Sequence, residues 1–150
     1  MNRNVEVNVT GIHSREGEPT EKVESLATGI YELLEDGSVA IEYDEEQDTG
    51  AGSMKVHNRV LIGADGRKME IVRAGATSST LTFAEDLEYD TEYATPYGTM
   101  LMKVRTKSFD LTRVGGDEEI KVVTDYDLEI EGRVVSSSMI VIDIKNAVAS

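Results

Sequence analysis

The residue whose type and position most suggest ligand chemistry is Arg73, in the segment "KMEIVRAG". Alternate side chains of an extended strand point to the same side, so Arg73 shares a face with Met69 and Ile71. A guanidinium on an apolar face must be paired, because a desolvated, unpaired charge is very costly. Its partner is one of the chain's own carboxylates, water reached at a strand end, or the carboxylate or phosphate of a ligand.

A second candidate is the stretch "YATPYGTMLMKV" at 93–104. Pro96 and Gly98 fit a turn, so the simplest interpretation is a hairpin connection followed by a strand whose methionines belong to the core. The functional alternative is that Tyr97 caps one mouth of a barrel, with methionines forming an adaptable apolar lining. The ligand-contact residues predicted by this alternative are Arg73, Tyr97, Met69, Met100 and Met102.

Catalytic patterns are absent from the sequence. Ser78 and Ser79 lack a GxSxG turn, and the two histidines, His13 and His57, are far apart in the chain. With 29 acidic residues, some pair of carboxylates will always be close, so carboxylate pairs indicate nothing. We predict no catalytic residues, and enzyme activity ranks third among the functions considered. It would require His13 or His57 to lie against a carboxylate in a cleft, with a hydroxyl in reach.

Metal and cofactor patterns are also absent. The acidic segment "EYDEEQDTGAGS" lacks the ligand spacing, central glycine and terminal glutamate of a calcium loop, and its charges are typical of a solvated loop. There is no cysteine and no HExxH spacing for zinc. "DTGAGSMK" does not match a phosphate-binding loop. We predict no metal site and no cofactor.

The elements that must position these residues are strands, because apolar residues recur with a period of two. In "IKVVTDYDLEIE" the even-numbered positions from Ile120 to Ile130 are mainly apolar, whereas the odd-numbered ones are largely charged. Ile140, Ile142 and Ile144 repeat the pattern after Glu131-Gly132-Arg133, a connection suited to a hairpin.

One stretch is ambiguous between helix and strand. "EKVESLATGIYELL" is the only segment with a plausible helical pattern, but Gly29 interrupts it. It fits equally well a long strand that enters the turn at Asp36-Gly37.

Turn signals at Asp36-Gly37, Asp65-Gly66 and Gly115-Gly116 separate the predicted strands at short intervals. With no internal repeat and no linker, this spacing indicates one domain over residues 1–150. We predict an all-β fold with little or no helix, a single antiparallel up-and-down barrel of about eight to ten strands, since closure removes exposed edges. A β-sandwich is the structural alternative.

These segments resemble the YwiB-like family, a bacterial family of unknown function with a calycin, or lipocalin-like, barrel. The resemblance covers nearly the whole chain. Its most specific parts are Arg73 and Gly75 in "VRAGATSSTLTF", the strand Ser79-x-Leu81-x-Phe83, and Thr95-Pro96-Tyr97-Gly98-Thr99. The resemblance implies the barrel but no activity and no site residues. Analogy with lipocalins adds the expectation of a small-molecule cavity.

Composition limits the partners and the compartment. A net charge of −14 repels nucleic acids and anionic lipid surfaces at long range. No segment has the roughly 18 apolar residues that span a bilayer, and the N-terminus does not resemble a signal peptide. The lack of cysteine fits a reducing compartment, so we expect a cytoplasmic protein.

Two functions from different classes follow. The first is a non-enzymatic barrel that binds a small apolar or amphipathic ligand, with Arg73 as a polar anchor. The second is a structural or protein-interaction module with a solid core, whose acidic surface meets a basic partner or a second copy of the chain. The sequence does not decide between a monomer and a homodimer.

Overall fold

The structure is a computed structural model that describes residues 2–15, 17–48, 52–75, 78–96, 98–115 and 117–146. Over these residues the chain forms ten strands and no helix. The first five are β1 (Asn2–Ser14), β2 (Glu21–Leu33), β3 (Val39–Asp48), β4 (Ser53–Ile62) and β5 (Lys68–Ala74). The last five are β6 (Ser78–Ala84), β7 (Glu88–Thr95), β8 (Gly98–Val114), β9 (Glu119–Ile130) and β10 (Arg133–Asn146).

Each strand pairs antiparallel with the next along the chain, and β1 pairs with β10 to close the barrel. The closing register runs from Val5 opposite Asn146 to Ser14 opposite Ser137. The predicted antiparallel up-and-down barrel is therefore confirmed, with a strand number inside the expected range. A sandwich with two open edges is not what the described strands form.

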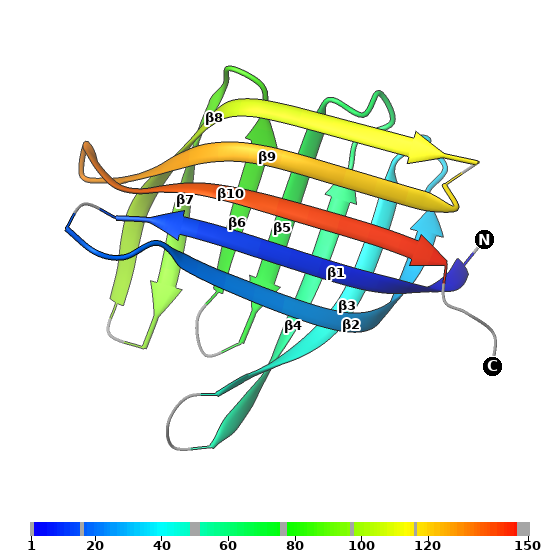
Figure 1. Cartoon of the computed structure of the whole chain (residues 1–150), viewed down its shortest axis with the longest axis horizontal. Coiled ribbons are helices and arrows are strands. Elements are labelled where there is room, and N and C mark those ends of the chain that lie inside the picture. The colour runs from blue at the N-terminus through cyan, green and yellow to red at the C-terminus, as the bar shows by residue number, and fades with distance from the viewer. Residues whose placement is uncertain are drawn as a thin grey trace.

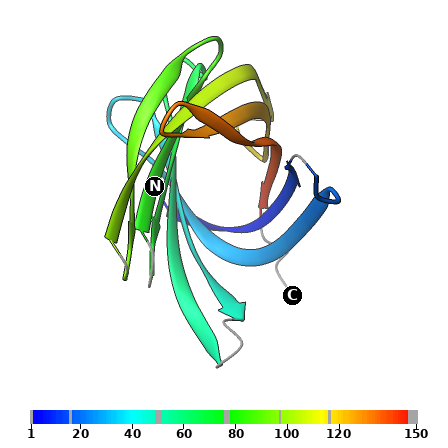
Figure 2. The same ribbon diagram turned by 90° about the vertical axis from the view of Figure 1, so that its left-hand side faces the viewer.

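The barrel is flattened into two layers whose strands cross at a steep angle. In Figure 1, β1, β2, β9, β10 and the long strand β8 run across the front, whereas β4 to β7 stand nearly upright behind them. Figure 2 shows the same two layers from the side, joined where the chain passes from β2 to β3 and from β7 to β8. The front layer therefore contributes one set of inward side chains, and the back layer contributes the other.

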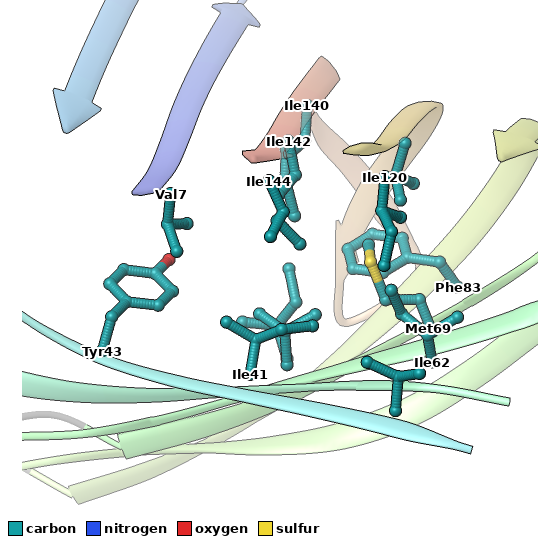
Figure 3. Packing of buried hydrophobic residues seen from close by; sticks show 14 of the residues in the cluster. Val7, Ile41, Tyr43, Ile62, Met69, Phe83, Ile120, Ile140, Ile142 and Ile144 are labelled. Atoms are coloured by element: carbon teal, nitrogen blue, oxygen red, sulfur yellow. The ribbon is translucent and has the colours of Figure 1, made fainter. Parts of the chain in front are cut away.

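The core lies between the layers, where alternate side chains of both point inward. Figure 3 shows Ile41, Ile62 and Met69 of the back layer facing Ile120, Ile142 and Ile144 of the front layer. Phe83 lies edge-on to Tyr126, with ring centroids 4.9 Å apart. The fully buried large side chains are Phe83, Ile41, Ile62, Met69, Ile120, Ile142, Ile144, Val5, Val7, Val39, Val60 and Val104.

The strands predicted from alternation lie where expected. Ile120, Val122, Thr124 and Tyr126 of β9 are buried on one face. The connection to β10 turns at Glu131 and Gly132, whose φ angles are 53° and 80°. Such positive φ values are what a tight hairpin turn requires. The turns at Gly37 and Gly66 also have positive φ.

The ambiguous stretch is a strand. Residues 21–33 form β2, which pairs with β1 from Asn2 opposite Glu32 to His13 opposite Glu21. Gly29, which obscured the pattern, lies where the backbone of β3 comes closest. A Cβ at this position would be 2.7 Å from the carbonyl oxygen of Glu42 and 3.1 Å from Cβ of Tyr43. The missing side chain thus permits the contact between the two layers.

Pairing between β2 and β3 covers only part of β2. It runs from Gly29 opposite Tyr43 to Leu33 opposite Val39. Residues 21–28, which we call the free edge of β2, pair with β1 on one side and have no strand on the other among the described residues. Beyond Tyr43, β3 continues with β4 as a two-stranded ribbon, the acidic ribbon (residues 44–48 and 53–57), which leaves the barrel at the bottom of Figure 1.

A polar cluster occupies the end of the barrel near the β8–β9 turn. We call Arg3, Tyr31, Arg113 and Asp117 the closed-end cluster. Arg113 donates two hydrogen bonds to the Asp117 carboxylate, at 2.7 and 3.0 Å, and the Tyr31 hydroxyl donates another. Arg3 donates to the Asp117 carbonyl oxygen and lies 4.1 Å from the centre of the Tyr31 ring. These contacts tie β1, β2 and β8 to one turn.

Candidate functional site

The inward face of the barrel changes from apolar to polar along the strands of the back layer. On β3 the inward series runs from Val39 and Ile41, both 0% exposed, through Tyr43 to Glu45. On β5, Met69 is 1% exposed and the series ends at Arg73, whose side chain is 36% exposed. One end of the barrel is therefore packed, and the other, which we call the open end, presents charged groups on its inner wall.

Three residues of adjacent strands form the polar centre of the open end. Arg73 Nη2 donates to Glu45 Oε1 at 2.6 Å, and Asn58 Nδ2 donates to the same oxygen at 3.1 Å. Asn58 is 1% exposed and lies opposite Arg73 in the β4–β5 register. We call Glu45, Asn58 and Arg73 the mouth cluster. Arg73 thus has a carboxylate partner from its own chain, and two of its neighbours are polar groups that sequence patterns did not single out.

The front layer contributes a second polar group at this end. His13 Nδ1 lies 2.8 Å from Ser138 Oγ, and the two residues are opposite each other in the β1–β10 register. Ser138 in turn lies opposite Tyr126 of β9. Ser138 is 5% exposed and Tyr126 is 2% exposed. The imidazole, hydroxyl and phenol therefore form a row across three adjacent strands.

The pKa values of two tyrosines show that the polar groups of the two layers influence each other. The pKa of Tyr43 is raised to about 12, because burial and, to a lesser extent, the Glu45 carboxylate raise it more than the Arg73 cation lowers it. Burial also raises the pKa of Tyr126, while its hydrogen bond with Ser138 and the charge of Arg73 oppose the shift. Arg73 on the back layer therefore acts electrostatically on a phenol of the front layer.

The structure does not bring the three predicted methionines together. Met69 lies in the packed core opposite Phe83, at the other end of β5 from Arg73. Met102 is 9% exposed, whereas Met100, next along the same face of β8, is 42% exposed. Met100 and Met102 therefore line the wall towards the open end, and Met69 supports the core beneath it.

The stretch around Tyr97 connects β7 to β8, as its hairpin interpretation predicts. The β7–β8 register runs from Glu88 opposite Arg105 to Thr95 opposite Gly98, and Gly98 has a φ of 132°. Tyr97 itself lies outside the described residues. Its predicted role at a barrel mouth stays a prediction.

A shallow hollow lies close to Arg73, but on the outer surface of the barrel. It has a volume of about 270 Å³ and is lined by Val72, Arg73, Ala74, Ser78, Ser79, Thr80 and Glu92. Val72 and Ala74 alternate with Arg73, so they face away from the interior. The hollow therefore opens on the outer surface of β5 and β6, and it is distinct from the inner wall at the open end.

The two histidines have different partners, which bears on acid–base chemistry. His57, on the acidic ribbon, has Nδ1 2.7 Å from Asp44 Oδ1 and Nε2 3.3 Å from Glu42 Oε1. These hydrogen bonds, first that with Asp44 and then that with Glu42, raise the pKa of His57. Among the described residues, His13 contacts a hydroxyl and His57 contacts carboxylates, so neither histidine is hydrogen-bonded to both a carboxylate and a hydroxyl.

Two other kinds of site are absent from the residues that the structure describes. Among them, no group of three or more histidine, aspartate or glutamate side chains could hold a metal ion. In the same part of the chain, no helix is long and apolar enough to cross a membrane.

Comparison with known proteins agrees with this fold. Residues 7–142 match the model of a family described as "Domain of unknown function (DUF1934)". The chain belongs to this family. Its structure is similar to the crystal structure of the ywiB protein from Bacillus subtilis, with a TM-score of 0.80 and 20% sequence identity, covering 98% of this chain and 94% of that one. The resemblance inferred from sequence is confirmed, and at this identity the structural match shows the fold alone. No curated protein matches the chain.

Proposed function

We propose that this member of the family binds a small amphipathic molecule with an acidic group at the open end of its barrel. The observation that carries the proposal is the placement of Arg73, a partly exposed cation at the end of an otherwise apolar inward series. A guanidinium can hold a carboxylate, sulfonate or phosphate through two parallel hydrogen bonds. The compartment we expect, the cytoplasm, stays a prediction.

The apolar part of such a ligand would lie along β8. Met102 lies opposite Ile130 of β9, and Met100 lies opposite Tyr93 of β7. Thioether side chains adapt to different ligand shapes, and the 42% exposure of Met100 leaves apolar surface for a ligand to cover. These contacts would supply affinity, and Arg73 would fix the orientation.

Binding would require the ligand to compete with Glu45. The ligand's acidic group would replace or share the carboxylate that Arg73 now contacts at 2.6 Å. Asn58 would remain as a neutral donor for whichever carboxylate is present. Affinity for an anionic ligand is therefore set by the balance between Arg73 and Glu45.

The second candidate is a structural or protein-interaction module without a ligand. The same Arg73–Glu45 contact favours it, because the chain's own carboxylate already neutralises the cation. The two candidates make opposite predictions for variants of the mouth cluster.

The test uses 8-anilinonaphthalene-1-sulfonate, a fluorescent molecule with one sulfonate and an apolar ring system. We expect saturable binding to the native protein, weakened about 10-fold by Arg73→Gln, because a hydrogen bond to a charged group contributes about 1.5 kcal/mol. Glu45→Gln should strengthen binding, because it removes the competing carboxylate.

The matched control is Arg59→Gln, which removes an equal charge from β4, where the Arg59 side chain is 41% exposed and within 3.9 Å of Glu42. It should leave binding unchanged. Binding that responds equally to Arg73→Gln and Arg59→Gln would indicate a general charge effect. Absence of saturable binding to both the native protein and Glu45→Gln would favour the module without a ligand.

A further inference from the structure

The free edge of β2 has few of the features that normally protect a strand edge. Natural sheets cover, bulge or shorten their edges, or place proline and lysine on them, because unpaired backbone groups are ready to pair with another strand. Residues 21–28 contain no proline, and their register with β1 is continuous, without a bulge. Lys22 is the only lysine in residues 21–28, and its Nζ lies 2.9 Å from Glu24 Oε1.

Apolar side chains are exposed on both faces of this region. On the outer face, Leu26 of the free edge is 72% exposed, and Ile30, just beyond the free edge, is 51% exposed. Val23, on the inward face, is 49% exposed. A strand added beside β2 would cover apolar surface on both faces while pairing with the backbone, which is the usual way in which extended peptides bind to a sheet edge.

The charges around the edge indicate the chemistry of the partner. Glu21 and Glu24 are exposed on the edge itself, and Asp44 and Glu46 are exposed on the acidic ribbon. Lys22 contacts Glu24, and His57 and Lys55 contact Asp44, but the carboxylates of the edge and of the ribbon outnumber these cations. A second copy of the chain would bring its own net charge of −14 against these carboxylates. An extended segment with lysine or arginine at alternate positions would complement them.

We propose that the free edge of β2 accepts an extended basic segment of a partner protein by antiparallel or parallel strand addition. This interaction uses the outer rim of the barrel and the β2 backbone, so it is independent of ligand binding at Arg73. The two proposals can fail separately.

The test uses a synthetic peptide of about eight residues with alternating lysine and valine, which matches the length of the edge at about 3.3 Å per residue. We expect saturable binding by fluorescence anisotropy, with hydrogen-exchange protection gained at residues 21–28 and not at 29–33, which already pair with β3. Replacing the central valine by proline should abolish binding, because proline cannot donate to the new ladder. Replacing the lysines by glutamates should also abolish it.

On the protein, Glu24→Lys should weaken binding of the lysine peptide up to about 5-fold, the effect of one exposed charge contact. Glu35→Lys, which makes the same charge change at an exposed position in the β2–β3 turn, should have a smaller effect. No saturable binding, equal binding of the proline peptide, or protection outside 21–28 would overturn the proposal. A dimer in sedimentation that protects 21–28 without peptide would show that a second copy is the occupant, and would also overturn it.

Discussion

At the scale of single residues, Arg73 and Asp117 lie at opposite ends of the barrel and differ in how fully their charges are exposed and paired. At a partly exposed rim, Arg73 donates a hydrogen bond to the Glu45 carboxylate, which also accepts one from the Asn58 amide. Asp117 accepts hydrogen bonds from Arg113 and Tyr31, and its side chain is only 13% exposed. The first arrangement leaves room for exchange of partners, whereas the second holds a turn in place.

Asp117 provides a prediction about stability and pH. Burial raises the pKa of its carboxyl, but the hydrogen bonds from Arg113 and Tyr31 and the charges of Arg113 and Arg3 outweigh burial and lower the pKa overall. A carboxyl with a lowered folded-state pKa stabilises the fold above its ordinary pKa, and this contribution is lost as the pH falls through the folded-state value.

Asp117→Asn should therefore lower the free energy of unfolding by about 2 kcal/mol at neutral pH, the cost of removing the charge that satisfies buried donors. The difference from the native protein should shrink at acidic pH, where the native carboxyl is also neutral. Urea unfolding at both pH values measures this. Asn tolerates the φ of 71° at this position, and Asp86→Asn, at an exposed turn residue with a φ of 61°, is the control and should change stability little.

The candidate site was only partly predictable, for reasons visible at this scale. Alternation placed Arg73 correctly on the face of Met69 and Ile71, because strand periodicity fixes the side to which a residue points. Its contact with Glu45 depends on the β3–β4 and β4–β5 registers, which one sequence does not reveal. The His13–Ser138 contact joins residues 125 positions apart, so no local pattern could indicate it.

At the scale of elements, β2 shows how one residue can hide a strand. Gly29 reduces the apparent strand pattern in sequence, yet it is required by the approach of β3. Strands such as β9 and β10, with long alternating patterns on both sides of a clear turn, were predictable. The extent of pairing between β2 and β3 was not, because the free edge results from the angle between the layers.

Gly29→Ala should destabilise the protein by about 2 kcal/mol, because the added Cβ would overlap the backbone oxygen of Glu42 and crowd Val7 Cγ2 at 3.3 Å. The measurement is the urea midpoint at constant slope. Gly63→Ala is the matched control, since its nearest neighbour would be 3.4 Å away, an ordinary contact. Equal effects of both substitutions would show that the loss reflects glycine removal and not the approach of β3.

At the scale of the whole molecule, the chain's two described ends lie on neighbouring strands. Val5 of β1 is opposite Asn146 of β10, and both strands are paired over long registers. The polypeptide therefore returns to its starting point, and the order in which the strands occur along the chain matters less than their order around the barrel.

A circular permutant should therefore fold. Joining residue 146 to residue 2 through a short flexible linker, with new ends between Asp36 and Gly37 in an exposed turn, should preserve the circular dichroism spectrum and a single cooperative unfolding transition. New ends between Thr124 and Asp125, in the middle of β9, should prevent folding, because they interrupt a strand that pairs on both sides. If both permutants behaved alike, continuity of the strands would not be what stabilises the barrel.

The pairing of β1 with β10 also has a consequence for synthesis on the ribosome. The Val5 and Asn146 partners are 141 residues apart, so at about 5–20 residues per second the first strand waits on the order of 10 s for its neighbour to be made. During translation the nascent chain can form its hairpins in order, but its amino-terminal strand keeps one unsatisfied edge until β10 leaves the exit tunnel. The barrel can therefore close only after β10 has left the exit tunnel.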